Sequence, residues 1–213
     1  MRITVFGAAG NVSSRIVREA LDRGHEVTAV MRNLNRAHEL PKGVKAVAGD
    51  ASKVEDIRAL GAGQDLIITA TRPQQGQEHE LAEITHAFMA ALKGSPVRLL
   101  LVGGAGGLVV PNSQGRLVVD DPQFVPLAWR DIAVACTEQL EICRNSNLVN
   151  WSYLSPAANL APGERTGQFR LGLDELILDE LGQSSVSMED LAVAMLNEAE
   201  QPQHINQRFT VGY

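Results

Sequence analysis

Short apolar segments alternate with amphipathic ones along most of the chain. The apolar segments predict six strands, at 2–6, 26–30, 44–48, 66–70, 97–102 and 151–154. Segments with a helical period lie between them, after residue 10 and at 52–60, 77–92 and 130–144. This alternation is typical of an α/β fold in which helices cover both faces of a mostly parallel sheet. We expect a doubly wound, Rossmann-like sheet with right-handed crossovers and the strand order 3-2-1-4-5-6.

Local signals mark where several helices begin and end. Gly24 follows the first helix and predicts a left-handed C-cap. Ser52 and Glu55 have the spacing of a capping box, which predicts that a helix starts there. Ser187 and Asp190 have the spacing of an N-cap before a final helix at 191–199.

The character of the chain changes after Pro156. Glycines at 163, 167 and 172 interrupt short extended pieces, and the final helix and a last strand at 208–211 follow. We interpret residues 1–213 as a single domain with a Rossmann core at 1–155. Residues 156–213 are expected to form a small lobe on the substrate side, together with the final helix and strand.

Composition and charge narrow the class of partner. The chain has 213 residues, a net charge of −6 and a pI near 5.4, and no stretch of clustered Lys and Arg. Because nucleic-acid binding requires cations that neutralise phosphates, we expect no DNA or RNA partner. The longest apolar stretch, 97–110, is too short to span a bilayer and contains four glycines, so we expect no membrane association.

The first residues and the cysteines indicate a compartment. Met1 and Arg2 run directly into the first predicted strand, which leaves no room for a signal peptide. Cys136 and Cys143 are seven residues apart on one predicted helix. That spacing is a rise of about 10.5 Å, beyond the roughly 7 Å limit for a disulfide. Two reduced thiols predict a cytoplasmic protein.

The segment from Ile3 to Ile16 carries the most informative chemistry. A β-prone run meets a glycine-rich turn at Gly7, Ala9 and Gly10, and a helical pattern begins at once. This arrangement points the free N–H groups and the positive dipole end of a helix at one place. A pyrophosphate suits that place because Gly7 and Gly10 have no Cβ atom to obstruct it. An ordinary tight turn is the alternative interpretation.

The end of the second predicted strand indicates which dinucleotide binds. An acidic residue at this place holds the ribose 2′-hydroxyl in a dinucleotide fold. Here the chain has Arg32 and no carboxylate, and Arg36 follows one turn later. Since a guanidinium suits a 2′-phosphate, we expect NADP(H) to be favoured over NAD(H). A solvated surface charge is the alternative role for Arg32.

The ends of two further strands supply candidate ligand contacts. Asp50 and Ala51 follow the third strand, and they are free to meet the adenine if Ser52 caps the next helix. Ala70 and Thr71 follow the fourth strand and are expected beside the nicotinamide ribose. The next residue, Arg72, either belongs to this group or is a surface charge.

Six motifs follow one another in a specific order: Gly7-Ala-Ala-Gly10, Val30-Met-Arg-Asn33, Gly49-Asp50-Ala51, Val102-Gly-Gly-Ala-Gly106, Leu154-Ser-Pro156 and Ser187-x-x-Asp190. In this order they resemble the atypical short-chain dehydrogenase/reductase group with NmrA-like, NAD(P)H-binding domains. Similar chains are described as NADH-flavin reductases and as biliverdin reductase B. The resemblance covers nearly the whole chain and implies a Rossmann fold that binds NADP(H). The candidate cofactor-binding residues are Gly7, Ala9, Gly10, Asn11, Val12, Arg32, Arg36, Asp50, Ala51, Ala70, Thr71 and Gly103.

The sequence departs from the family pattern at two places. Ser13 stands at the third glycine of Gly-x-x-Gly-x-x-Gly, so we expect the first helix slightly farther from the first strand. The Tyr-x-x-x-Lys pair of typical short-chain dehydrogenases is absent, since the last lysine is Lys93 and the only tyrosines are Tyr153 and Tyr213. The usual acid that protonates a substrate carbonyl is therefore missing.

The missing pair leaves three hypotheses. The one we favour is an NADPH-dependent oxidoreductase that passes hydride to a flat acceptor such as a flavin or quinone, which needs little help from a protein acid. A second is an enzyme with an atypical acid, for which Ser113, Arg130 and Asp131 are the catalytic candidates. A third is a non-catalytic NADP(H) sensor that regulates a partner. A nucleotide-sugar epimerase is disfavoured, because it also relies on the missing pair.

The remaining ring side chains add little chemistry. His79 and His86 are seven residues apart on one predicted helix, too distant to share a metal, so no metal site is expected. Trp129 and Trp151 are able to line a pocket for a flat ligand, but Trp151 lies on a strand and is expected in the core. We expect a small-molecule acceptor as the partner and a monomer or homodimer.

Overall fold

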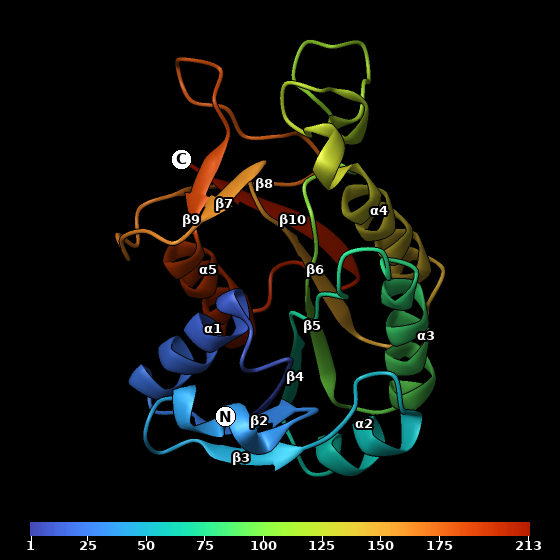
Figure 1. Ribbon diagram of the computed structural model, residues 1–213, viewed down its shortest axis with the longest axis vertical. Helices are drawn as coiled ribbons and strands as arrows, with labels where there is room; N and C mark the ends of the chain where they lie inside the picture. Colours follow the sequence, from blue (N-terminus) through green and yellow to red (C-terminus); the bar gives the residue numbers. More distant parts are fainter.

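The computed structural model describes residues 1–213 and contains one eight-stranded sheet in the order β3-β2-β1-β4-β5-β6-β10-β8 (Figure 1). Its strands are β1 (Arg2–Phe6), β2 (Glu26–Met31), β3 (Lys45–Ala48), β4 (Leu66–Thr69), β5 (Arg98–Val102), β6 (Trp151–Ser155), β8 (Arg170–Gly172) and β10 (Gln207–Gly212). Neighbouring strands are parallel except β8, which is antiparallel to β10. The predicted order of the first six strands is confirmed.

Helices cover both faces of the sheet (Figure 1). The helices are α1 (Asn11–Asp22), α2 (Val54–Gly61), α3 (Glu80–Leu92), α4 (Arg130–Arg144) and α5 (Met188–Glu200). Alternate residues of a strand point to opposite faces, so Val5 packs in the core beneath α1 and α5, while Phe6 packs in the core beneath α2, α3 and α4. Both cores are built from continuous apolar strands, as a buried parallel sheet requires.

Two excursions lie beyond the carboxyl ends of the central strands. One runs from the end of β5 to α4 and contains the short 3₁₀ helices η2 (Val118–Asp120) and η3 (Leu127–Trp129). The other contains β7 (Asn159–Ala161) and β9 (Ser185–Ser187), which pair as a separate parallel sheet. The last strand, β10, returns to the main sheet beside β6.

The helix ends confirm two of the predicted caps. Gly24 has φ +79°, its N–H bonds to the carbonyl of Leu21, and the N–H of His25 bonds to the carbonyl of Ala20, which is a Schellman cap. The Ser187 hydroxyl accepts the N–H of Asp190 at 2.9 Å and caps α5. The third long helix begins at Glu80, three residues later than predicted, because 77–79 form turns.

The predicted capping box at Ser52 and Glu55 is wrong. Helix α2 begins at Val54 after Lys53, and no side chain caps it. The Ser52 N–H and hydroxyl both donate to the Asp50 carboxylate, at 2.9 and 2.8 Å. Asp50, which was expected to be free for a ligand, therefore stabilises this turn through its carboxylate.

Candidate functional site

The turn between β1 and α1 is built by close backbone packing. Gly7 has φ +74°, and a Cβ atom there would lie 3.3 Å from Cγ2 of Thr71, two residues after β4. The Gly10 N–H donates to the carbonyl of Gly7 at 2.8 Å and closes the turn. A side chain at Gly7 would be disfavoured both by the positive φ and by the close approach to Thr71.

The first turn of α1 presents unused hydrogen-bond donors. The N–H groups of Asn11, Val12 and Ser13 have no acceptor in the protein. Gly10, at the N-cap, has no side chain that could accept one of them. The first turn contains no acidic residue to occupy them. Free donors at the positive end of a helix are able to bind an anion, and the sequence-based expectation that this turn holds a pyrophosphate stays a prediction.

Ser13 fits against the sheet in place of a glycine. Its side chain is fully buried, and its hydroxyl donates to the carbonyl of Ala70 at 3.4 Å. The hydroxyl thus ties α1 to the segment that follows β4, two elements that both border the glycine turn.

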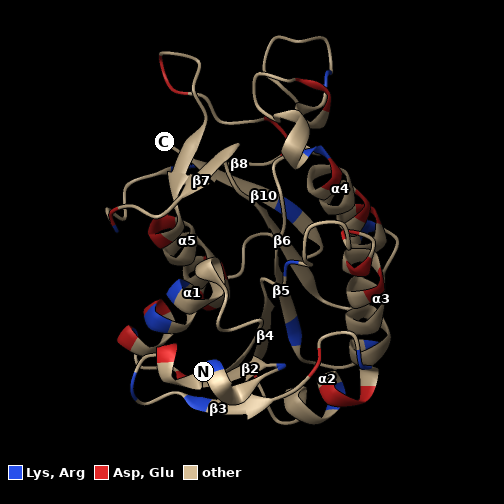
Figure 2. Cartoon of the chain, viewed as in Figure 1, with Lys and Arg blue, Asp and Glu red and all other residues tan.

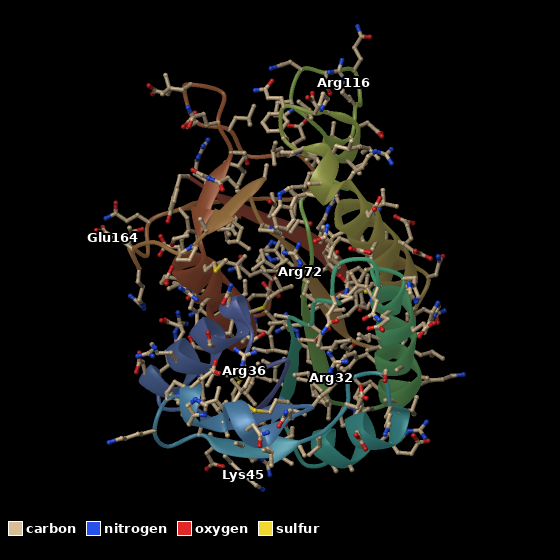
Figure 3. All side chains as sticks on the ribbon, viewed as in Figure 1. Arg32, Arg36, Lys45, Arg72, Arg116 and Glu164 are labelled. Atoms are coloured by element: carbon tan, nitrogen blue, oxygen red, sulfur yellow. The ribbon has the colours of Figure 1, made fainter.

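Two arginines follow β2, and only one of them has an acidic partner. Arg32 is exposed and forms no ion pair or hydrogen bond. Arg36 in η1 (Leu34–Glu39) forms two bonds to the Glu39 carboxylate, at 2.8 and 2.7 Å, and donates to the carbonyl of Ala9 at 3.0 Å. Figure 3 shows both residues in the same part of the molecule. Arg32 has all its donors available for an anion, whereas Glu39 already neutralises Arg36.

Asp50 lies near Arg32 but is not a free carboxylate. Hydrogen bonds from the Ser52 N–H, above all, lower the pKa of Asp50, and the charge of Arg32 adds a smaller effect. The Asp50 N–H donates to Asp56 at 2.9 Å. The expectation that Ser52 leaves the Asp50 side chain free is wrong; Ala51, beside it, is buried.

The segment after β4 carries a second exposed cation. The hydroxyls of Thr69 and Thr71 lie 3.2 Å apart. Arg72 stacks over the Trp129 ring, with Cζ 4.9 Å from the ring centroid. Trp129 is 54% exposed, whereas Trp151 is 2% exposed and lies in the core, as predicted.

Gly103, after β5, supports the core and leaves no room for a side chain. A Cβ atom there would lie 1.9 Å from Cζ of Tyr153. The Tyr153 hydroxyl donates to the carbonyl of Cys136 at 2.8 Å and lies 3.1 Å from Oε1 of Gln139. Burial raises the pKa of Tyr153 well above its usual value. Tyr153 is therefore a structural residue, and the Gly103-Gly104 pair in the sequence was the signal of this close contact.

The three candidate acids all lie between the end of β5 and the first turn of α4. The Ser113 hydroxyl donates to the carbonyl of Val110 and accepts the Arg116 N–H at 3.1 Å, so it stabilises a turn. Figure 3 shows Arg116 at the opposite end of the molecule from Arg32. Arg130 lies next to Trp129 and pairs with Asp120 at 3.6 Å, and Asp131 is exposed in the first turn of α4.

Other features lie apart from the glycine turn. No group of three His, Cys, Asp or Glu side chains is placed to hold a metal ion, and no helix has the length and apolar character needed to cross a membrane. Cys136 and Cys143 are both free thiols. A cavity of about 600 Å³, lined by 111–112 and 170–178, contains neither Arg32 nor Arg72. Figure 2 shows acidic and basic residues interspersed over the helices.

Known proteins resemble this chain over its whole length. The model of an NAD(P)H-binding family matches residues 7–202. The protein YwnB of Bacillus subtilis is 37% identical over 213 residues, which cover 99% of this chain and 98% of YwnB. A Bacteroides thetaiotaomicron structure, named as a candidate epimerase, is 36% identical with a TM-score of 0.91, covering 100% of this chain and 96% of its own. A Streptococcus pneumoniae structure, named as a candidate NADH-flavin reductase, is 29% identical with a TM-score of 0.88, covering 100% and 99%.

Proposed function

Because the chain belongs to the NAD(P)H-binding family, we propose that it is an NADPH-dependent oxidoreductase that passes hydride to a flat acceptor such as a flavin or a quinone. A bound nicotinamide supplies the hydride, and the acceptor also takes up one proton, so that one NADPH is oxidised for each acceptor reduced. The name of the Streptococcus pneumoniae relative supports a flavin as the acceptor.

The glycine turn fits the pyrophosphate of this cofactor. The free N–H groups of Asn11, Val12 and Ser13 face the end of the turn, and a Cβ atom at Gly7 would contact Thr71. An anion at this place gains hydrogen bonds from these N–H groups and a favourable interaction with the helix dipole.

The observation that carries the preference for NADPH is the unpaired Arg32. It is exposed and without an acidic partner at the end of β2, where the adenosine ribose lies in this fold. A 2′-phosphate there forms charge-assisted bonds with the guanidinium, which a 2′-hydroxyl cannot match.

The lack of a suitable acid supports an acceptor that needs none. The Tyr153 hydroxyl is buried and bonded, and the Tyr213 hydroxyl donates to Asp190 at 2.8 Å and accepts the Ser187 N–H at 3.1 Å. Neither phenol is free to protonate a carbonyl. The same feature disfavours a nucleotide-sugar epimerase, which relies on a tyrosine acid. The name of the Bacteroides thetaiotaomicron relative gives only an epimerase and no substrate.

The test is NADPH oxidation by the purified protein under anaerobic conditions, with FMN, riboflavin and a soluble quinone offered separately. We expect loss of the NADPH absorbance in step with acceptor reduction, and slower oxidation of NADH at the same concentration. Tight NADPH binding without oxidation by any acceptor contradicts the proposal and favours a sensor of the NADP(H) pair.

A further inference from the structure

Arg72 and Trp129 are in contact although they are far apart in the sequence. Arg72 follows β4, and Trp129 ends η3 just before α4. The guanidinium lies 4.9 Å from the centroid of the indole, in a cation–π contact. Each residue is exposed, so the pair forms part of the surface.

Both side chains have unused binding capacity. Arg72 makes no ion pair and no hydrogen bond, and the indole N–H of Trp129 has no acceptor. No carboxylate forms an ion pair with Arg72, although Glu78 lies close enough for the charge of Arg72 to act on it. Glu78 accepts the Gly76 N–H at 3.0 Å, and Asp120 pairs with Arg130. An exposed tryptophan beside an unpaired arginine offers a ligand both an aromatic face and a cation.

The position of the pair relates it to the cofactor turn. Arg72 is adjacent to Thr71, the residue that a Cβ atom on Gly7 would contact at 3.3 Å. The pair therefore lies beside the carboxyl ends of β1 and β4, where ligands bind in open α/β sheets. Figure 3 shows Arg72 near the middle of the molecule, between the helices of the two faces.

Arg72 is able to exchange its contact with the indole for a contact with an anionic ligand. A cation–π contact at an exposed site is weak, whereas bidentate bonds between a guanidinium and a phosphate are strong. An anionic ligand therefore draws Arg72 away from the indole. The ring face that Arg72 leaves is then available to stack with a flat aromatic group.

We propose that Trp129 and Arg72 form the acceptor site, in which Trp129 stacks on a planar ring and Arg72 binds an anionic group, so that phosphorylated flavins are preferred. The inference rests on the proposed function and adds a class of substrate to it. FMN and riboflavin are suitable probes because they share the ring and differ only in the phosphate.

The test compares the binding of FMN and riboflavin by calorimetry in the presence of NADP⁺. Arg72→Gln is expected to weaken FMN binding about tenfold and riboflavin binding less than about twofold. Lys93→Gln, which removes an exposed cation after α3 at the amino end of the sheet, is the matched control and leaves both affinities unchanged. Arg72→Lys keeps the charge and is expected to retain most of the preference for FMN.

A second readout isolates Trp129. An indole in contact with an isoalloxazine quenches its fluorescence by electron transfer, and phenylalanine does not. Wild-type protein is expected to quench bound FMN, and Trp129→Phe is expected to bind it with little quenching. The other tryptophan, Trp151, is buried in the core and provides no alternative contact.

The inference and the proposed function fail in different ways. Equal effects of Arg72→Gln on FMN and riboflavin, or a loss of FMN binding in Arg130→Gln instead, overturn the inference. So does undiminished quenching in Trp129→Phe. If NADPH is still oxidised by riboflavin in these cases, the proposed function stands; absence of turnover with every acceptor in the wild type removes both.

Discussion

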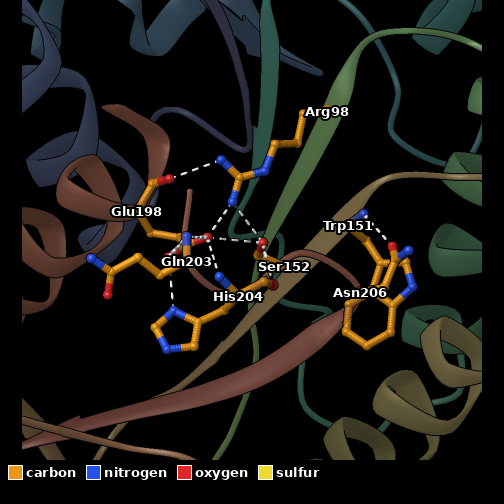
Figure 4. Close-up of polar contacts among 7 residues, drawn as sticks. All are labelled: Arg98, Trp151, Ser152, Glu198, Gln203, His204 and Asn206. Atoms are coloured by element: carbon orange, nitrogen blue, oxygen red, sulfur yellow. Dashed lines mark hydrogen bonds and ion pairs between the residues drawn. The ribbon is translucent and has the colours of Figure 1, made fainter. Parts of the chain in front are cut away.

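Two sets of charged residues, at opposite ends of the parallel sheet, differ in burial and in partners. At the amino end, Arg98 and Glu198 are buried with side-chain exposures of 12% and 3%, and they are surrounded by further partners (Figure 4). At the carboxyl end, Arg32 and Arg72 are exposed and have no ion partner. Buried charges must be compensated within the protein, whereas exposed ones are available to a ligand.

The buried network joins α5 to the sheet. Arg98, at the start of β5, pairs with the Glu198 carboxylate and donates to the Ser152 hydroxyl at 2.7 Å and to the Glu198 carbonyl at 2.8 Å. The Glu198 carboxylate also lies 2.8 Å from the ring Nδ1 of His204 and accepts the backbone N–H of His204 at 3.0 Å. One carboxylate therefore holds three segments together, and the comparison predicts that its loss affects folding rather than binding.

The largest expected effect is on this carboxylate. Glu198→Gln keeps the shape but leaves the Arg98 charge buried without its partner, so the free energy of unfolding should fall by about 3–5 kcal/mol. Urea unfolding measures the loss. Glu200→Gln, on the same helix with a 34% exposed side chain paired to Arg23, is the control and should cost at most about 1 kcal/mol. Similar losses in the two variants would contradict the contrast between the ends.

Acid should remove part of the same interaction. Burial opposes ionisation of Glu198, but the hydrogen bonds from His204 and Gln203 and the charge of Arg98 outweigh it and lower its pKa. A carboxyl with a lowered folded-state pKa stabilises the protein above its unfolded pKa of about 4.3 and loses this effect as pH falls toward the folded value. The difference in unfolding free energy between wild type and Glu198→Gln should therefore shrink below about pH 4. A constant difference down to about pH 3 would contradict this assignment.

At the carboxyl end, a charge change should affect binding and leave stability intact. Arg32→Glu is expected to weaken NADP⁺ about 100-fold and NAD⁺ only a few-fold, because the lost contact is with the 2′-phosphate. The unfolding free energy should change by less than about 0.5 kcal/mol. Calorimetric titration of both nucleotides measures this. Lys45→Glu, an exposed charge reversal at the start of β3, is the control, and an equal loss there would indicate a general charge effect.

The strand order was predictable because it depends on periodicity. The apolar run from Leu99 to Leu101 and its counterparts identify buried strands, and the order 3-2-1-4-5-6 is the one expected of a Rossmann-like fold built from them. Caps that depend on residues close in sequence, such as Gly24 and Ser187, were also predictable. The order of β10 and β8 beyond β6 was not, because it depends on contacts formed by chain segments distant in sequence.

The chemistry of the site was predictable only where backbone geometry determines it. Gly7 and Gly10 identify the turn from the sequence alone. The state of each charged side chain depends on competing partners: Asp50 bonds to Ser52, and Arg36 bonds to Glu39. The contact between Arg72 and Trp129 joins residues far apart in the chain, so no local sequence pattern predicts it.

The smallest expected effect is on NADP⁺ affinity, when Arg36 loses its ion pair with Glu39. Glu39 holds this guanidinium with two bonds, and its own charge repels a phosphate near Arg32. Glu39→Gln should therefore tighten NADP⁺ binding about two- to fivefold, with little change for NAD⁺, since an exposed ion pair has only a small effect. The gain should diminish at high salt, which screens exposed charges.

Glu26→Gln provides the control for Glu39→Gln, because it removes an exposed carboxylate at the opposite end of β2. An equal gain in that variant would mean that net charge alone governs the affinity. A gain for NAD⁺ as large as that for NADP⁺ would mean that Glu39 acts on the shared part of the nucleotides. Only a gain confined to Glu39→Gln and to NADP⁺ places Arg36 beside Arg32 in recognition of the 2′-phosphate, since this group alone distinguishes the two ligands.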